Sequence, residues 1–253
     1  MLRRGEIARR LFDSVVHTGE NAVIEEVRIG LGYAGVRLDK RHMGLAAILL
    51  HELPASCSAF TDAGKLAGSK AVSLLNNLIE GNNPLKKALG LATANALLHA
   101  TSGDDKRDSL SIMNLVYQDH VAMVGLFSPM VPKIEGMGAN LTIIERNPAR
   151  LAVLDKNESS RILKECTVAI ITATTLLNDT LEEVLNGLGN PRHVAILGPS
   201  TPLCPEIFHD TPVNHLGGAT VNDTKKIMQI ISEGGGTPAM RPYLRFVNLL
   251  IKS

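Results

Sequence analysis

Hydroxyl and amide side chains follow several short apolar runs in the second half of the chain. Ser128 lies in the loop after the first run, a threonine-rich loop spans Thr172 to Thr180, and Ser200 and Thr201 lie together after a later run. Hydroxyl groups can donate hydrogen bonds to a negatively charged ligand, and helix N-termini that open at such loops add backbone N–H groups. These residues therefore predict a site for a small anionic molecule.

Gly125 and Glu145 match only part of a nucleotide-binding pattern. The loop from Gly125 to Pro129 lacks the second and third glycines of G-x-G-x-x-G, so ordinary NAD or FAD binding is not expected. Glu145 ends the next apolar run, where a ribose-binding acid would lie. The alternative is an exposed strand-end carboxylate that pairs with Arg146.

The threonine-rich loop has two interpretations. Thr180 and Glu183 have the spacing of a capping box, in which the threonine hydroxyl satisfies a backbone N–H at the start of a helix. Capping would explain Thr180, but it would not explain Thr174, Thr175 and Asn178. We therefore expect these three residues to contact a ligand.

Motifs for a protein-ligated metal are not found. The eight histidines and three cysteines include no C-x-x-C, H-x-x-x-H or H-E-x-x-H. The nearest pairs, His51 with Cys57 and Cys204 with His209, lack standard ligand spacing. We expect a metal to arrive already chelated by a small anionic molecule, whose oxygens the loop hydroxyls would hold. No G-x-S-x-G elbow is found either, so catalytic residues stay unassigned and an enzymatic activity is left open.

The second half of the chain alternates apolar runs with helical patterns, as parallel βαβ units do. We therefore predict an α/β fold with a Rossmann-like, doubly wound parallel sheet over residues 109–253. Ligands bind such sheets beyond the carboxyl ends of the strands, and Gly218 in the fifth loop would permit close backbone approach. The runs are HVAMVG (120–125), LTIIER (141–146), TVAIIT (167–172), HVAILG (193–198) and VNHLGG (213–218).

The first half, residues 1–108, predicts a smaller α+β domain with strands before helices. After an N-terminal helix, the runs VIEEVRIGL and GVRLD are typical of a hairpin, and residues 44–50 add a third strand. A helix from Ser69 would end at Gly81, and Asn83 would cap the next one. The polar segment 101–109 predicts the domain boundary, at which we expect few contacts, so that residues from about 112 onward would fold alone.

Three residues of the first half are candidates to contact a ligand across an interdomain cleft. Tyr33 in the hairpin, Arg37 and Asn83 offer a phenol, a cation and an amide near loops or element ends. Tyr33 could equally pack within the hairpin. The first half would then act as a lid over the loops of the second.

Composition excludes several classes of partner. The formal net charge is +1 and no dense basic run occurs, which does not favour binding to nucleic acid. No apolar run approaches the ~20 residues that cross a bilayer, and the N-terminus lacks the apolar core of a signal peptide. Three cysteines at wide spacing indicate free thiols in a reducing compartment, so we expect a cytoplasmic protein.

Four segments, TATTLLNDTLEEVL, ILGPSTPLCPEIF, ISEGGGT and NNPLKKALGLATANAL, together resemble a family of prokaryotic proteins described as heavy-metal chelation proteins. The resemblance implies an enolase N-terminal-like domain, a Rossmann-like domain, an active site between them and a role in handling metal ions or chelates. Ala173 departs from the glycine that often follows the third strand. The matching residues are Asn83, Pro84, Thr174, Thr175, Asn178, Thr180, Gly198 to Thr201 and Gly234 to Gly236.

Three functions follow from these observations. The first is binding, and possible processing, of a small anionic molecule or metal chelate in the interdomain cleft, and any cofactor other than such a chelate is left open. The second is a transferase with a nucleotide-like cofactor such as S-adenosylmethionine and Glu145 on its ribose. The third is a non-catalytic regulatory or assembly protein. A homodimer is left open.

Overall fold

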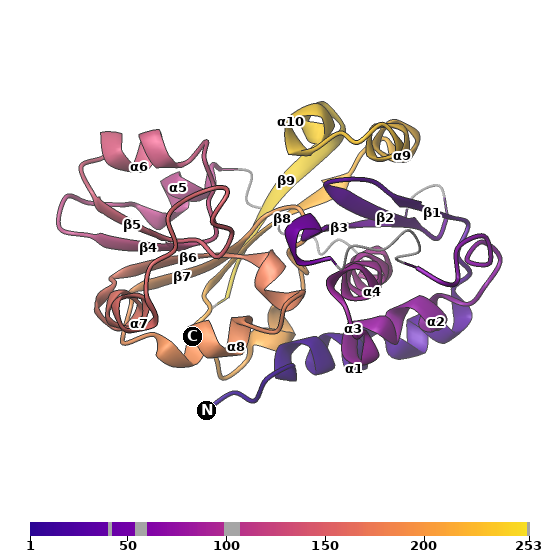
Figure 1. The fold of residues 1–253 in the computed structure, drawn as a ribbon, viewed down its shortest axis with the longest axis horizontal. Coiled ribbons are helices and arrows are strands. Elements are labelled where there is room, and N and C mark those ends of the chain that lie inside the picture. Colours follow the sequence, from indigo (N-terminus) through magenta and orange to yellow (C-terminus); the bar gives the residue numbers. More distant parts are fainter. Residues whose placement is uncertain (40–41, 54–59, 99–106, 252–253) are drawn as a thin grey trace.

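A computed structural model describes residues 1–39, 42–53, 60–98 and 107–251. Its larger sheet has six strands in the order β5-β4-β6-β7-β8-β9 (Figure 1). Strands β4 to β8 are mutually parallel, and β9 pairs with β8 in the antiparallel direction. The strands are β4 (His120–Val124), β5 (Asn140–Ile144), β6 (Val168–Thr172), β7 (His193–Leu197), β8 (His215–Val221) and β9 (Leu244–Leu250). The α/β prediction and its five strands are confirmed, whereas β9 was not predicted.

Side chains of the central strands alternate between two buried faces, as a doubly wound sheet requires. Val121, Met123 and Ile170 face the helices α5 (Ser109–Met113) and α6 (Val131–Gly136). Their neighbours Ala122 and Ile171 face the opposite side, where α7 (Lys156–Glu165) and α8 (Leu181–Gly187) lie (Figure 1). The continuous apolar runs of the sequence result from this burial on both faces.

The connections reverse direction between β4 and β6. The chain passes from β4 outward to β5, then returns to place β6 on the other side of β4. At such a switch point the two loops diverge and leave a crevice at the carboxyl ends of the strands. Gly125, which follows β4, has a φ of 83°, and a Cβ there would lie 2.5 Å from Thr172 Cγ2. Glycine therefore lets these two loops approach each other.

The first half has the predicted order of strands and then helices. After α1 (Glu6–Asn21), the strands β1 (Glu26–Ile29), β2 (Tyr33–Arg37) and β3 (Met43–Ala47) form an antiparallel sheet. The third strand ends earlier than predicted, and a 3-10 turn, η1 (Leu50–Glu52), follows it. The helix predicted from Ser69 is divided at Asn76 into α2 (Ala71–Leu75) and α3 (Asn77–Glu80). Asn83 Oδ1 accepts the Lys86 N–H at 2.9 Å and so caps α4 (Pro84–Leu97), as predicted.

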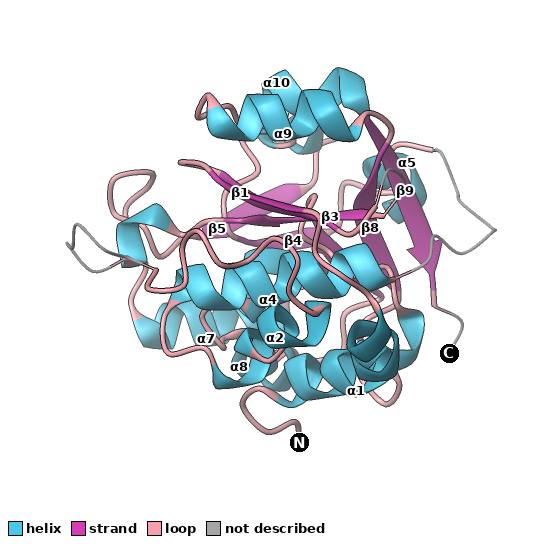
Figure 2. Cartoon of the chain, turned by 90° about the vertical axis from the view of Figure 1, so that its right-hand side faces the viewer, coloured by secondary structure: helices cyan, strands magenta, loops and turns pink. Residues whose placement is uncertain are grey.

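Helices from both halves of the chain cover the small sheet. Figure 2 shows α4 on one side of it and, on the other, α9 (Thr224–Ser232) with α10 (Thr237–Met240), which come from the second half. Ile227, Met228 and Ile231 of α9 pack with Leu45 of β3. The second half therefore completes the core of the first.

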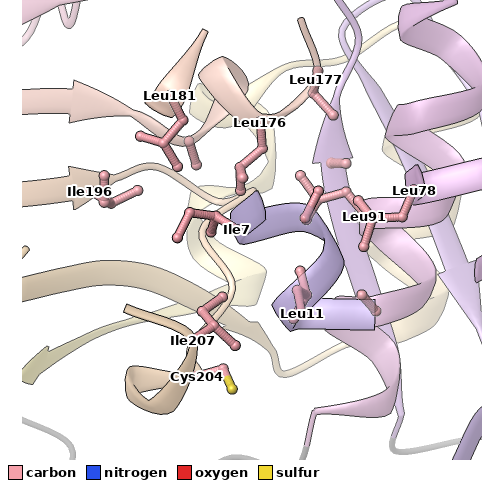
Figure 3. Close-up of a cluster of buried hydrophobic side chains, with 14 of the residues drawn as sticks. Ile7, Leu11, Leu78, Leu91, Leu176, Leu177, Leu181, Ile196, Cys204 and Ile207 are labelled. Atoms are coloured by element: carbon pink, nitrogen blue, oxygen red, sulfur yellow. The ribbon is translucent and has the colours of Figure 1, made fainter. Parts of the chain in front are cut away.

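One apolar cluster joins the two halves. Ile7 and Leu11 of α1 are fully buried beside Leu176, Leu181 and Ile207 (Figure 3). Contact between the halves is thus extensive, unlike the sparse contact expected from the polar segment 101–109, of which residues 101–106 lie outside the described residues. The boundary between residues 108 and 109 stays a prediction. No helix within the described ranges is long and apolar enough to cross a bilayer.

Candidate functional site

A cavity of about 930 Å³ lies at the switch point, between the two halves of the chain. Its floor includes Gly125, Glu145 and Thr174, which follow β4, β5 and β6. Residues 47–52, which follow β3 and include η1, form the wall from the first half. The volume falls in the range of about 300–1,000 Å³ that is usual for small-molecule sites.

The threonine loop directs only some of its polar groups into this cavity. The Thr175 hydroxyl donates to the Thr172 carbonyl at 2.7 Å and is 4% exposed, so it holds the turn η2 (Ala173–Leu176) together. The Thr172 and Thr174 hydroxyls are 3.1 Å apart and share one hydrogen bond. Among the described residues this leaves one hydroxyl hydrogen of the pair for a ligand.

The predicted capping box at Thr180 is wrong. Thr180 precedes α8 but makes no side-chain cap, since its backbone is helical (φ −104°, ψ −7°) where a capping residue is normally extended. Its hydroxyl donates to Asn178 Oδ1 at 2.8 Å. The positive φ of Asp179, 55°, turns the chain so that Thr180 faces back toward Asn178. Thr180 therefore orients the Asn178 side chain and does not cap α8.

Asn178 connects the two walls of the cavity. Its Nδ2 donates to Glu52 Oε1 at 3.1 Å, and His51 Nε2 lies 3.7 Å from the same oxygen. Next to it, Asp179 forms an ion pair with Lys87 of α4. His51 and Glu52 were not predicted as site residues, because nothing in their local spacing indicates a partner 126 residues away.

Glu145 lines the cavity, but its carboxylate is used within the protein. Oε1 accepts the N–H groups of Arg146 (2.8 Å) and Asn147 (3.0 Å). Oε2 accepts the Leu126 N–H at 3.1 Å and lies 2.9 Å from Arg150 Nη1. Burial alone would raise the pKa of Glu145. The N–H groups and the Arg150 charge have the opposite and larger effect, so the pKa lies below its usual range. Its ion-pair partner is thus Arg150, where the sequence suggested Arg146.

Arg146 supplies a cation without a partner to the cavity wall. Among the residues that the structure describes, its guanidinium has no hydrogen bond or ion pair, and it also lines an adjoining cavity of about 650 Å³. Lys156 is a second cation at the rim, with its side chain 88% exposed and 3.9 Å from Glu183. An anion bound here would meet positive charge from one side.

The three candidates from the first half lie away from the cavity. The Tyr33 hydroxyl is 2.7 Å from Thr237 Oγ1 of α10, and its ring is buried between β2 and α9. Arg37 forms ion pairs with two neighbouring glutamates, and Asn83 caps α4. The face of β2 that carries Tyr33 points toward α9, which the hairpin sequence alone could not show.

Four candidates from the second half also lie outside it. Ser128 is exposed and does not line the cavity. Ser200 Oγ accepts the Ala47 N–H at 2.8 Å, which attaches β3 to the loop after β7. Thr201 is 3% exposed and lines a separate cavity of about 270 Å³. At Gly218 a Cβ would lie 2.9 Å from a Leu203 side chain. Of the predicted ligand-binding residues, Glu145, Thr174, Thr175 and Asn178 line the large cavity.

The cysteine and histidine pairs considered for metal binding do not form a centre within the described ranges. No group of three or more His, Cys, Asp or Glu residues is arranged there to hold a metal ion. Burial and the neighbouring Glu206 raise the pKa of the Cys204 thiol to about 11, which disfavours the thiolate form that metals bind. Cys57, the suggested partner of His51, lies outside the described residues.

Two family models match successive segments of the chain. The family description "Putative heavy-metal chelation" applies to both matched segments, residues 12–98 and residues 108–250. An uncharacterized protein of Methanocaldococcus jannaschii is 23% identical over 232 residues, which are 88% of each chain.

Two crystal structures of DUF364-family proteins of unknown function have similar folds. The one from Pyrococcus horikoshii has a TM-score of 0.83 at 19% identity and covers 97% of this chain and 100% of its own. The one from Desulfitobacterium hafniense has a TM-score of 0.78 at 21% identity, with 97% and 98% coverage. By the match over residues 108–250, which is more than half of its length, this chain belongs to the DUF364 family, described as "Putative heavy-metal chelation".

Proposed function

We propose that the chain binds a small anionic molecule or a metal chelate in the cavity between its two halves. The observation that carries this proposal is Arg146, a guanidinium on the cavity wall that has no hydrogen bond or ion pair among the described residues. An unpaired guanidinium on a cavity wall favours a ligand that supplies negative charge, because the guanidinium fork suits carboxylate and phosphate oxygens. The hydroxyl pair of Thr172 and Thr174 adds a neutral donor on the floor.

The transferase alternative is less well supported by the geometry. A ribose would need acceptor positions on Glu145, but both oxygens already accept two donors each, from backbone N–H groups and Arg150. Binding a ribose diol there would displace bonds that hold the loops after β4 and β5. A purely regulatory or assembly role predicts that no small molecule stabilises the protein.

The proposal is tested by thermal unfolding and calorimetry with citrate, pyrophosphate, nitrilotriacetate and adenosine monophosphate. A ligand that binds only the native state raises the melting temperature by mass action. Arg146→Ala should weaken binding of the stabilising anion by about 10- to 100-fold, which corresponds to losing one charged hydrogen-bonding group. Its own melting temperature should be unchanged because Arg146 is exposed.

Arg161→Ala is the matched control. Arg161 is an exposed arginine of α7 that lies outside the cavity and pairs with Glu165 at 3.5 Å. Its loss should leave anion binding unchanged. If no anion stabilises the wild-type protein, or if both variants weaken binding equally, the cavity is not the anion site.

A further inference from the structure

The two walls of the cavity differ in charge. The wall from the second half carries three cations, Arg146, Arg150 and Lys156, and two carboxylates, Glu145 and Glu183. The wall from the first half is residues 47–52, whose titratable side chains are His51 and Glu52. A ligand that spans the cavity therefore meets a cation at one end and an imidazole beside a carboxylate at the other. An imidazole next to a carboxylate is a donor set that first-row transition metal ions accept.

The two donors are close enough to share one metal ion. His51 Nε2 and Glu52 Oε1 are 3.7 Å apart. Metal bonds of about 2.0–2.2 Å place two neighbouring ligand atoms roughly 3.0–3.5 Å apart, so a small rotation suffices. The His51 side chain is 36% exposed and can make this rotation.

Glu52 is held in place by a residue from the opposite wall of the cavity. Asn178 Nδ2 donates to its Oε1, and Thr180 in turn fixes Asn178. The pair His17 and Glu20 on α1 has almost the same separation, 3.6 Å, but both side chains are mainly exposed, at 91% and 57%, and they line no cavity described here. The distance between a histidine and a carboxylate therefore does not by itself indicate a metal site. The position of Glu52 in a cavity and its hydrogen bond from Asn178 do.

We infer that His51 and Glu52 bind the metal ion of an anionic chelate whose negative end lies toward Arg146, an inference that rests on the proposed function. Two protein ligands hold a bare ion weakly, and within the described residues no third His, Cys, Asp or Glu joins them. The small molecule must supply the rest of the coordination sphere. A chelate that leaves at least two coordination positions open is therefore bound more tightly than one that leaves none.

Two nickel complexes separate this inference from simple anion binding. Nitrilotriacetate leaves two neighbouring positions of an octahedral Ni(II) ion to water, whereas ethylenediaminetetraacetate occupies all six. By calorimetry, the wild-type protein should bind the nitrilotriacetate complex at least tenfold more tightly than the ethylenediaminetetraacetate complex. The His51→Ala and Glu52→Gln variants should each lose this preference but still bind the ethylenediaminetetraacetate complex. Asn178→Ala should weaken binding of the nitrilotriacetate complex by about 10- to 100-fold, because the Glu52 carboxylate loses the hydrogen bond that holds it in place.

His17→Ala is the matched control and should leave both affinities unchanged. Coordination by His51 should also shift the visible absorption of Ni(II) in the wild type but not in His51→Ala. If the preference survives His51→Ala, or is lost in His17→Ala, the metal is held elsewhere and the inference is wrong. If both complexes bind equally, the inference fails while the anion site stands; if neither complex nor free nitrilotriacetate binds, the proposed function fails as well.

Discussion

Replacing Glu145 by glutamine tests whether this residue supports the loops or binds a ligand. Glutamine keeps the shape of the side chain, but it has one acceptor oxygen where the carboxylate has two. If that oxygen keeps the Arg146 and Asn147 N–H groups, the amide NH₂ faces the Leu126 N–H and Arg150. Water can solvate Arg150, whose side chain is 46% exposed, but the Leu126 N–H loses its acceptor.

The expected cost follows from these contacts. One unsatisfied buried donor costs about 1–3 kcal/mol, and weakening the charged hydrogen bonds raises the total to about 2–4 kcal/mol. For a chain of this size that lowers the melting temperature by about 5–15 °C. Because the folded-state pKa of Glu145 is lowered, its contribution is present above the unfolded pKa and is lost as the pH falls. The difference between wild type and Glu145→Gln should therefore shrink below about pH 4.5.

Urea unfolding at pH 7 and pH 3.5 measures both effects. Glu183→Gln serves as the control, since Glu183 is 72% exposed and only 3.9 Å from Lys156, and it should change stability by less than about 0.5 kcal/mol. The reasoning is refuted if Glu145→Gln unfolds like the wild type at pH 7. If it does so and also loses affinity for a nucleotide-like cofactor, Glu145 is the ribose-binding acid that the sequence suggested.

Three further substitutions test the fold around the cavity. Gly125→Ala should destabilise the protein by at least about 2 kcal/mol, because the added Cβ sits at a positive φ and clashes with Thr172. Gly136→Ala is the control and should be neutral or stabilising, because no atom lies near the added Cβ. Equal effects of the two substitutions in thermal unfolding would contradict this reasoning. The hydrogen-bonded Arg192 lowers the pKa of Asp119 to about 2. Asp119→Asn should therefore lower the free energy of unfolding by about 2 kcal/mol at pH 7, and by less as the pH falls from about 4 to 2. A loss of stability in urea unfolding that does not depend on pH would exclude the ion pair as its source. Leu11→Ala should cost about 2–5 kcal/mol and lower a single unfolding transition of the full chain, and two separate transitions would show that the halves fold independently.

Local signals in the sequence predicted the elements that local interactions decide. The cap at Asn83 needs only the Lys86 N–H three residues later, and the parallel strands are recognisable because both of their faces are buried. Strand β9 was missed because its burial depends on pairing with β8, about 30 residues earlier, and its apolar residues do not alternate regularly. Tyr33 was assigned to the site because a hairpin sequence does not show which face packs on α9.

The rule that ligands bind at the carboxyl ends of parallel strands located the cavity, but it could not tell which polar groups remain available there. Ser200 attaches β3, Glu145 holds two loops, and Asn178 fixes Glu52 across the cavity. The contacts of Ser200 and Asn178 join segments 153 and 126 residues apart, and the contact of Glu145 with Leu126 spans 19 residues. The sequence alone therefore does not show whether such a polar side chain holds the fold together or is available to a ligand. What distinguishes the site is the groups that the folded protein leaves uncommitted. Among the described residues that line this cavity, the Arg146 guanidinium is the clearest of them.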